Sequence, residues 1–215
     1  MTQRESSLFG YNDEERKVIS QLLAAGVLNR LDGHGFEPGK AYITCGCGRF
    51  NQEADERVLS LAGRGRRDPL NGMANVSFVG AHLAVFPFSP LNDDRPYYTV
   101  IEVTLRTFMN TEGNNYLTIV GHHATCRGCE KYKLKLIQCL DLMVKGKLNI
   151  KKRLAIGKTK VLLIFGLYDH DSGYHSFLRL RAKGWVQWRK THPEIEVWPQ
   201  GKEPDPGLLE SSDAA

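Results

Sequence analysis

Tyr116–Cys129 reads Tyr-Leu-Thr-Ile-Val-Gly-His-His-Ala-Thr-Cys-Arg-Gly-Cys, and this stretch decides the fold that the sequence predicts. Its first residues are apolar and partly β-branched, which predicts a buried strand that ends at Gly121. Two histidines and two cysteines follow that glycine. Open α/β sheets build their sites at the carboxyl ends of strands, and imidazole and thiolate are ligands that zinc prefers. The stretch therefore predicts a zinc site at one edge of a sheet, to which other segments bring further ligands.

The composition is that of a globular protein. The chain has 215 residues, of which 41% are apolar and 25% charged, and this length suits one α/β domain. No stretch is apolar over the roughly 18 residues that a membrane helix needs, and Met1–Ser7 lacks the apolar core of a secretory signal. We therefore expect a cytoplasmic protein without a membrane span. The net charge of +5 would suit a nucleic-acid partner but is not specific for one.

The cysteines point to metal chemistry rather than to disulfides. Their number is five, and an odd count in a chain that looks cytosolic argues against a disulfide framework. Four of them form two close pairs, Cys45 with Cys47 and Cys126 with Cys129. Cys139 stands alone in an apolar stretch, and we interpret it as a small buried hydrophobic residue.

Hydrophobic periodicity predicts an α/β fold with a mainly parallel central sheet flanked by helices. Helices are expected over residues 12–28, 53–61 and 134–146. Strands are expected over 41–44, within 75–86, and over 97–106, 117–120, 161–165 and 174–177. The segment 97–106 could form a strand or a helix, and the alternation of Ile101, Val103 and Leu105 favours the strand. The expected organisation is an N-terminal helical segment (1–37), a zinc-binding α/β domain (38–199) and a flexible tail (200–215).

Two distant segments carry the expected metal ligands. Cys45 and Cys126 each follow a predicted strand, and parallel neighbouring strands would bring both to the same edge of the sheet. His123 precedes Cys126 by three residues, a spacing that lets both side chains reach one ion. The expected zinc ligands are therefore Cys45, His123 and Cys126.

Three segments resemble those of the β-class carbonic anhydrases, in the order in which that family has them. Pro38–Arg49 ends in Cys-Gly-Cys-Gly-Arg and is similar to the first zinc segment of the family, Cys-x-Asp-x-Arg after a strand. Ile119–Gly128 resembles the second, a strand followed by Gly-His-x-x-Cys-Gly. Phe165–Gly173 resembles the late strand and turn. The resemblance covers about residues 38–177.

The resemblance implies a zinc lyase that hydrates carbon dioxide or a similar small linear substrate. Zinc would be held by Cys45, His123 and Cys126, and zinc-bound hydroxide would attack the substrate, because zinc lowers the pKa of its bound water to ~7. Arg49 and Cys47 occupy the positions of the arginine and aspartate that orient this water in the family. The resemblance also implies a homodimer or a higher oligomer.

The chain departs from the family at these positions. Cys47 stands where the family has Asp, so Arg49 lacks its carboxylate partner, and an ionised Cys47 could become a fourth ligand that closes the site. His122 matches the family by its adjacency to Gly121, whereas His123 matches by its distance from Cys126, so His122 remains an alternate ligand.

The alternative function is a non-catalytic zinc module. Two close cysteine pairs are typical of structural sites with four thiolates, here Cys45, Cys47, Cys126 and Cys129. The run Lys145–Lys160 is basic and contains no acidic residue, so its surface could bind RNA or a protein.

Overall fold

The secondary structure alternates between helix and strand along most of the chain. The computed structural model describes residues 11–31, 41–61, 74–112, 116–154, 160–169 and 171–199. Its helices are α1 (Asp13–Ala24), α2 (Gly48–Leu61), α3 (Ala81–Ala84), α4 (Leu91–Asp94), α5 (Tyr97–Glu112), α6 (Arg127–Lys131), α7 (Leu136–Arg153) and α8 (Ala182–Thr191). Its strands are β1 (Leu28–Arg30), β2 (Ala41–Cys45), β3 (Ala74–Phe78), β4 (Tyr116–His122), β5 (Lys160–Asp169) and β6 (Tyr174–Leu180).

The strands form one six-stranded open sheet of order β1-β6-β5-β4-β2-β3. The pairs β3–β2, β2–β4 and β4–β5 are parallel, whereas β5–β6 and β6–β1 are antiparallel. The α/β class is confirmed, but the sheet is mixed and not mainly parallel. β6 runs antiparallel to β5 because only residues 170–173 connect the two strands. A parallel return would need a crossover of about a dozen residues or more.

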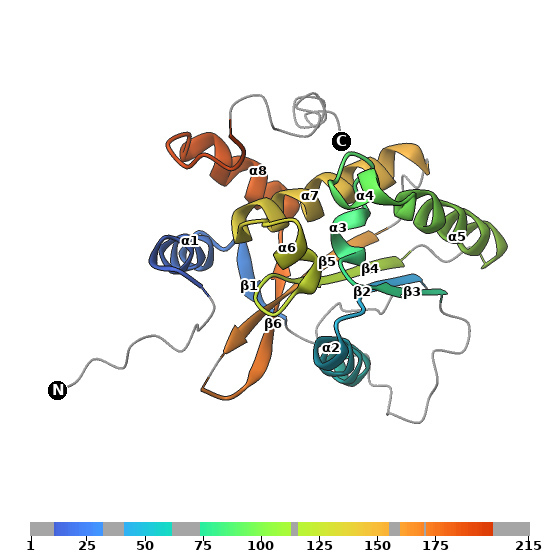
Figure 1. The fold of residues 1–215 in the computed structure, drawn as a ribbon, viewed down its shortest axis with the longest axis horizontal. Coiled ribbons are helices and arrows are strands. Elements are labelled where there is room, and N and C mark those ends of the chain that lie inside the picture. The colour runs from blue at the N-terminus through green and yellow to red at the C-terminus, as the bar shows by residue number, and fades with distance from the viewer. Residues whose placement is uncertain are drawn as a thin grey trace.

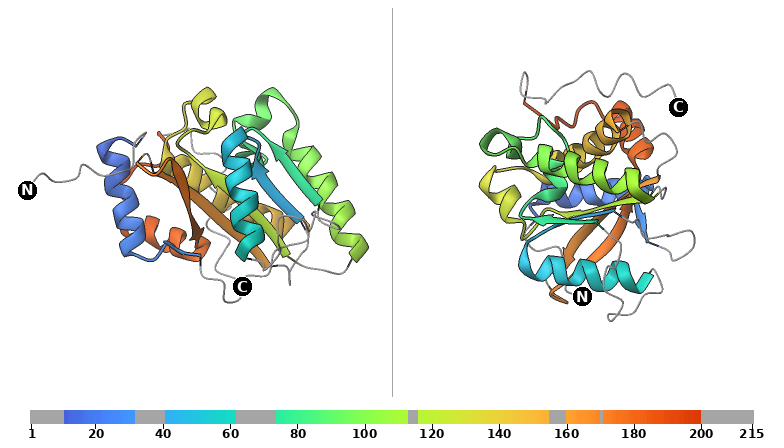
Figure 2. Two further views of the ribbon diagram at one scale, coloured as in Figure 1. Left: turned by 90° about the horizontal axis from the view of Figure 1, so that it is seen from below. Right: turned by 90° about the vertical axis from the view of Figure 1, so that its right-hand side faces the viewer.

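Helices cover both faces of the sheet (Figures 1 and 2). α2 lies on one face, whereas α3, α5 and α7 lie on the other. Crossovers between parallel strands are right-handed, so a reversal of direction along the sheet moves the connecting helix to the other face. The chain runs from β2 outward to β3 through α2, and then back past β2 to β4 through α5.

The predicted strand over 97–106 is wrong, because α5 occupies this segment. Tyr98, Ile101 and Leu105 are its buried residues, at the three- and four-residue spacing of a helix. Val100 and Val103 are more than half exposed. The apparent alternation of Ile101, Val103 and Leu105 therefore combines two buried residues with one that faces solvent.

The N-terminal helix forms as expected but ends earlier. Asn12 caps α1, since its side chain accepts a hydrogen bond from the Glu15 N–H and the Glu15 side chain accepts one from the Asn12 N–H. Gly26 has a φ of 66° and turns the chain out of the helix, so Leu28 begins β1 instead. The predicted tail over 200–215 lies outside the described residues.

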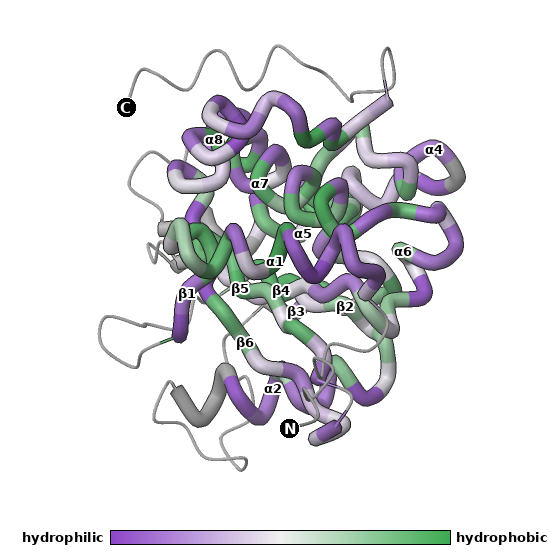
Figure 3. The backbone as a smooth tube through the Cα atoms, turned by 90° about the vertical axis from the view of Figure 1, so that its left-hand side faces the viewer, coloured by the Kyte–Doolittle hydropathy of each residue, from purple (hydrophilic) through white to green (hydrophobic). Residues whose placement is uncertain are grey.

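Apolar residues gather on the strands at the centre of the fold (Figure 3). The expected helix over 134–146 is present as the longer α7, whose buried side packs on β4 and β5. Within the described ranges, no helix has the length and apolar character needed to cross a membrane.

Candidate metal centre

The candidate site lies at a topological switch point of the sheet, where the order of the strands along the chain reverses. β2 is flanked by β3 on one side and β4 on the other, although the chain visits them in the order β2, β3, β4. Thr44 pairs with Val120, so Cys45 and His122 both stand at the carboxyl ends of their strands. Ligands of open α/β sheets bind at this kind of switch point.

Four donor side chains meet at this edge. Cys45, Cys47, His122 and Cys126 each offer one ligand atom, and these atoms all lie within 4.8 Å of one another. The Cys45 sulfur lies 3.2 Å from that of Cys47 and 3.8 Å from that of Cys126, which is 81 positions away in the chain. Cys45 and Cys126 are buried, whereas Cys47 is half-buried. This group could hold a metal ion.

The His122 ring is oriented with one nitrogen free for an ion. Its Nδ1 lies 2.9 Å from the carbonyl oxygen of Ala124, to which it can donate a hydrogen bond. Its Nε2 is buried and has no hydrogen-bond partner among the described residues. Phe50 stacks on the ring with a centroid separation of 3.7 Å. Metal-bound histidines characteristically use one nitrogen for the ion and donate the other N–H to an oxygen, so the arrangement fits a ligand.

Glycines bring the ligand segments close together. A Cβ at Gly46 would lie 2.9 Å from the Cα of Phe78, so only glycine allows the chain to leave β2 at this point. A Cβ at Gly128 would lie 3.0 Å from the Cα of Gly80. The Gly80 N–H in turn donates to the Cys45 sulfur over 3.3 Å. The close contact of Gly128 with Gly80 therefore holds Cys126 near Cys45.

The sulfurs share a negative charge in the metal-free chain. Hydrogen bonds from Cys129, Cys45 and Cys47 lower the pKa of the Cys126 thiol. Hydrogen bonds to Cys126 and Cys47, together with burial, raise the pKa of the Cys45 thiol. Cys126 is therefore the thiol of this group that ionises most readily, and a bound cation would favour ionisation of its neighbours.

The histidine beside the thiols is His122, and not the His123 that the spacing favoured. The His123 Nε2 lies 2.8 Å from the Leu134 carbonyl oxygen and 3.9 Å from the Glu15 carboxylate, and its ring stacks on Tyr11. His122 is the last residue of β4 and lies beside the thiols, and the chain between it and Cys126 contains Thr125, whose φ is 66°. The ligand spacing is therefore four residues rather than three.

The structure places Arg49 and Cys129 in contacts of their own. Arg49 donates to Glu53 over 2.8 Å and lies over the ring of Tyr174. Its carboxylate partner is thus four residues along α2, and not at position 47. Cys129, an alternate ligand, belongs to a second group of donor atoms with His82 and Cys139.

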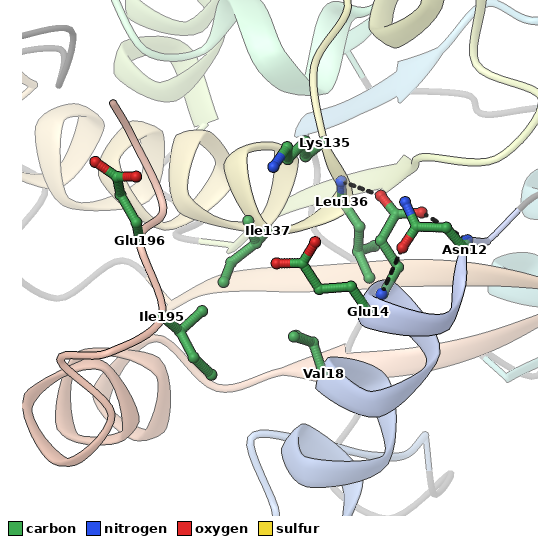
Figure 4. A pocket seen from close by; sticks show the side chains of 9 residues that line it. Asn12, Glu14, Val18, Lys135, Leu136, Ile137, Ile195 and Glu196 are labelled. Atoms are coloured by element: carbon green, nitrogen blue, oxygen red, sulfur yellow. Dashed lines mark hydrogen bonds between the residues drawn. The ribbon is translucent and has the colours of Figure 1, made fainter. Parts of the chain in front are cut away.

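Two pockets lie near this region. One has a volume of about 390 Å³ and is lined by residues that include Cys126, Cys129 and His123. The other lies between α1 and the start of α7, where Val18, Ile137 and Ile195 face one another (Figure 4). Only the first reaches a member of the four-residue group, through Cys126.

The basic run Lys145–Lys160 is not a uniform solvated surface in its described part, 145–154. Lys145 is fully buried, and its ammonium lies 3.2 Å from the Asp141 carboxylate. Lys147 is half-buried, and this desolvation lowers its pKa to about 8. Residues 155–159 lie outside the described part of the chain.

The sequence did not indicate how Phe50 and His82 support the candidate site. Phe50 follows the Cys-Gly-Cys segment and carries no chemistry of its own, yet it fixes the plane of the His122 ring. His82 is fully buried behind Gly121, at which a Cβ would collide with its ring.

Comparison with known proteins adds no identity, since no family model, curated protein or solved structure matches this chain.

Proposed function

We propose that this chain is a zinc protein in which Cys45, Cys47, His122 and Cys126 hold one Zn²⁺. The observation that carries the proposal is the buried Nε2 of His122, which has no hydrogen-bond partner in the described chain and belongs to a group with three sulfurs. Leaving such a buried polar atom unsatisfied costs about 1–3 kcal/mol, and a metal ion would remove that cost.

The donor set and its spacing support zinc. Thiolate and imidazole donors favour zinc and other thiophilic metals over magnesium or calcium, which take oxygen ligands. Zn–S bonds of about 2.3 Å in a tetrahedron separate two sulfurs by ~3.8 Å. The sulfurs of Cys45 and Cys126 have this separation.

Four protein ligands complete a tetrahedral zinc shell, so the proposed role of the ion is structural. It would join the ends of β2 and β4 to the residue before α6. These segments are distant in sequence, and the ion would therefore stabilise the switch point of the sheet against local opening.

Cobalt substitution tests the proposal. The metal-free chain, titrated with Co²⁺ under reducing conditions, is expected to develop thiolate-to-cobalt charge-transfer bands and the strong d–d bands of a tetrahedral site. Cys45→Ser should weaken these bands, because it removes the ligand that contacts both neighbouring sulfurs. A wild-type chain that folds but shows no such absorption would contradict the proposal.

A second candidate function is carbon dioxide hydration at the same centre. It is favoured by the exposure of Cys47, the one half-buried member of the group, and by the cavity of about 390 Å³ that reaches Cys126. If Cys47 is displaced, three protein ligands remain, and the ion would supply Lewis-acid chemistry at an open position.

Cys47→Ala tests this candidate. The variant is expected to keep zinc and to hydrate carbon dioxide faster than the wild type in a stopped-flow pH-indicator assay, because it frees one coordination position. Zinc retained without hydration at any pH would reject carbon dioxide as the substrate. Loss of zinc would show that Cys47 is an indispensable ligand, which leaves only the structural role.

A further inference from the structure

A second group of metal-binding side chains lies next to the first. The ligand atoms of His82, Cys129 and Cys139 all lie within 4.8 Å of one another. The Cys139 sulfur is 3.8 Å from that of Cys129 and 3.6 Å from the His82 Nε2. The three residues are at most 2% exposed. They come from α3, α6 and α7, so three separate elements converge on this point.

The group is held rigidly in place. His82 packs against the backbone of Gly121, where a Cβ would collide with the imidazole and lie 2.8 Å from the sulfur of Met143. Gly121 therefore keeps the ring at a fixed position beside α7. Preorganised donors of this kind bind an ion without an ordering cost.

Packing alone explains the positions of these three side chains less well than metal binding does. The two thiols also approach the His122 carbonyl oxygen, at 3.6 Å from Cys139 and 3.8 Å from Cys129. Such S–H contacts are weak, and buried cysteines are often mere small hydrophobic residues. The His82 Nε2, however, faces the Cys139 sulfur, and the Nδ1 on the other side of the ring is buried with no hydrogen-bond partner among the described residues, so no hydrogen bond through Nδ1 explains the position of the ring. A polar atom in that condition is unusual in a folded protein.

We propose that His82, Cys129 and Cys139 bind a second thiophilic metal ion of the zinc class, beside the first. This site is distinct from the group proposed above and shares no residue with it. The three donors would supply three of the four positions of a tetrahedral shell.

The charges of the donors suit this arrangement. Burial lowers the pKa of His82 to about 4, so its imidazole is neutral and able to ligate at neutral pH. Five thiolates would carry one more negative charge than two ions of charge +2 carry positive charge. The pKa of Cys129 is raised well above its ordinary value, mainly by hydrogen bonds to Cys126 and Cys139, so this side chain is a neutral thiol before a metal binds. Metal binding would therefore release protons, since the ligands must ionise.

Metal stoichiometry of the full chain tests the proposal. The metal-free wild type, titrated with Co²⁺ or Zn²⁺ under reducing conditions, is expected to bind about two ions per chain. Cys139→Ala should bind about one ion and should keep thiolate-to-cobalt bands from Cys45, Cys47 and Cys126. His123→Ala, which changes a residue outside both groups, should bind as many ions as the wild type.

The outcomes separate this inference from the proposed function. One ion in the wild type and one in Cys139→Ala would overturn the second site and leave the first intact. No tetrahedral cobalt spectrum would overturn both. If Cys139→Ala fails to fold, His82→Gln serves in its place, and the wild-type stoichiometry decides the question without any variant.

Discussion

Replacing His122 by alanine is expected to lower the affinity of the first site for zinc by more than ~100-fold, whereas the same change at His123 should leave it unaltered. Loss of a residue that only supports a metal ligand costs about 10- to 100-fold in affinity, and loss of the ligand itself must cost more. His122 offers its Nε2 to the three sulfurs, whereas the His123 Nε2 lies against the Leu134 carbonyl oxygen. Competition with a chromophoric chelator measures both affinities.

The two variants form a matched pair. They remove the same imidazole from adjacent positions, and both rings contact an aromatic side chain, Phe50 for His122 and Tyr11 for His123. A loss of packing alone would therefore lower the stability of both variants but the zinc affinity of neither. Equal zinc affinities in the two variants would contradict the assignment of His122.

The sequence predicted the edge of the sheet that carries the site, because strands and ligand residues are adjacent in the chain. Cys45 follows β2 and His122 ends β4, and parallel pairing then brings them together. The choice between the two histidines depended on the conformation of the turn between β4 and Cys126, which includes Thr125. Thr125 takes a positive φ, which threonine rarely adopts, and no residue type in the turn signalled it.

The second group of donors was beyond prediction for a different reason. His82 and Cys139 are single residues in apolar surroundings, and each alone is more often a packed core residue than a ligand. Only the packing of α3 and α7 over the sheet brings them to Cys129. The strand predicted over 97–106 failed for a related reason, since β-branched residues on α5 imitate the alternation of a strand.

A buried cluster of charged and aromatic side chains fixes α8 and the segment after it to α7. The Asp141 carboxylate accepts hydrogen bonds from the indole N–H groups of Trp185 and Trp198, over 3.1 and 2.7 Å. It also lies 3.2 Å from the Lys145 ammonium and 3.3 Å from the Arg189 guanidinium. Asp141 and Lys145 are fully buried, so this carboxylate is the common acceptor for groups from three segments.

Asp141→Ala is expected to lower the free energy of unfolding by about 3–5 kcal/mol, because it removes the carboxylate that compensates the buried Lys145 ammonium and leaves two indole N–H groups without this acceptor. Urea denaturation followed by tryptophan fluorescence measures the change. Glu102→Ala is the control, since its ion pair with Arg106 involves a half-exposed guanidinium and should contribute no more than about 1 kcal/mol. The double variant Asp141→Leu with Lys145→Met should recover only the part of the loss that comes from the buried Lys145 charge, because the two indole N–H groups still lack the Asp141 acceptor. If Asp141→Ala destabilises the protein no more than Glu102→Ala does, the carboxylate does not hold α8 against α7.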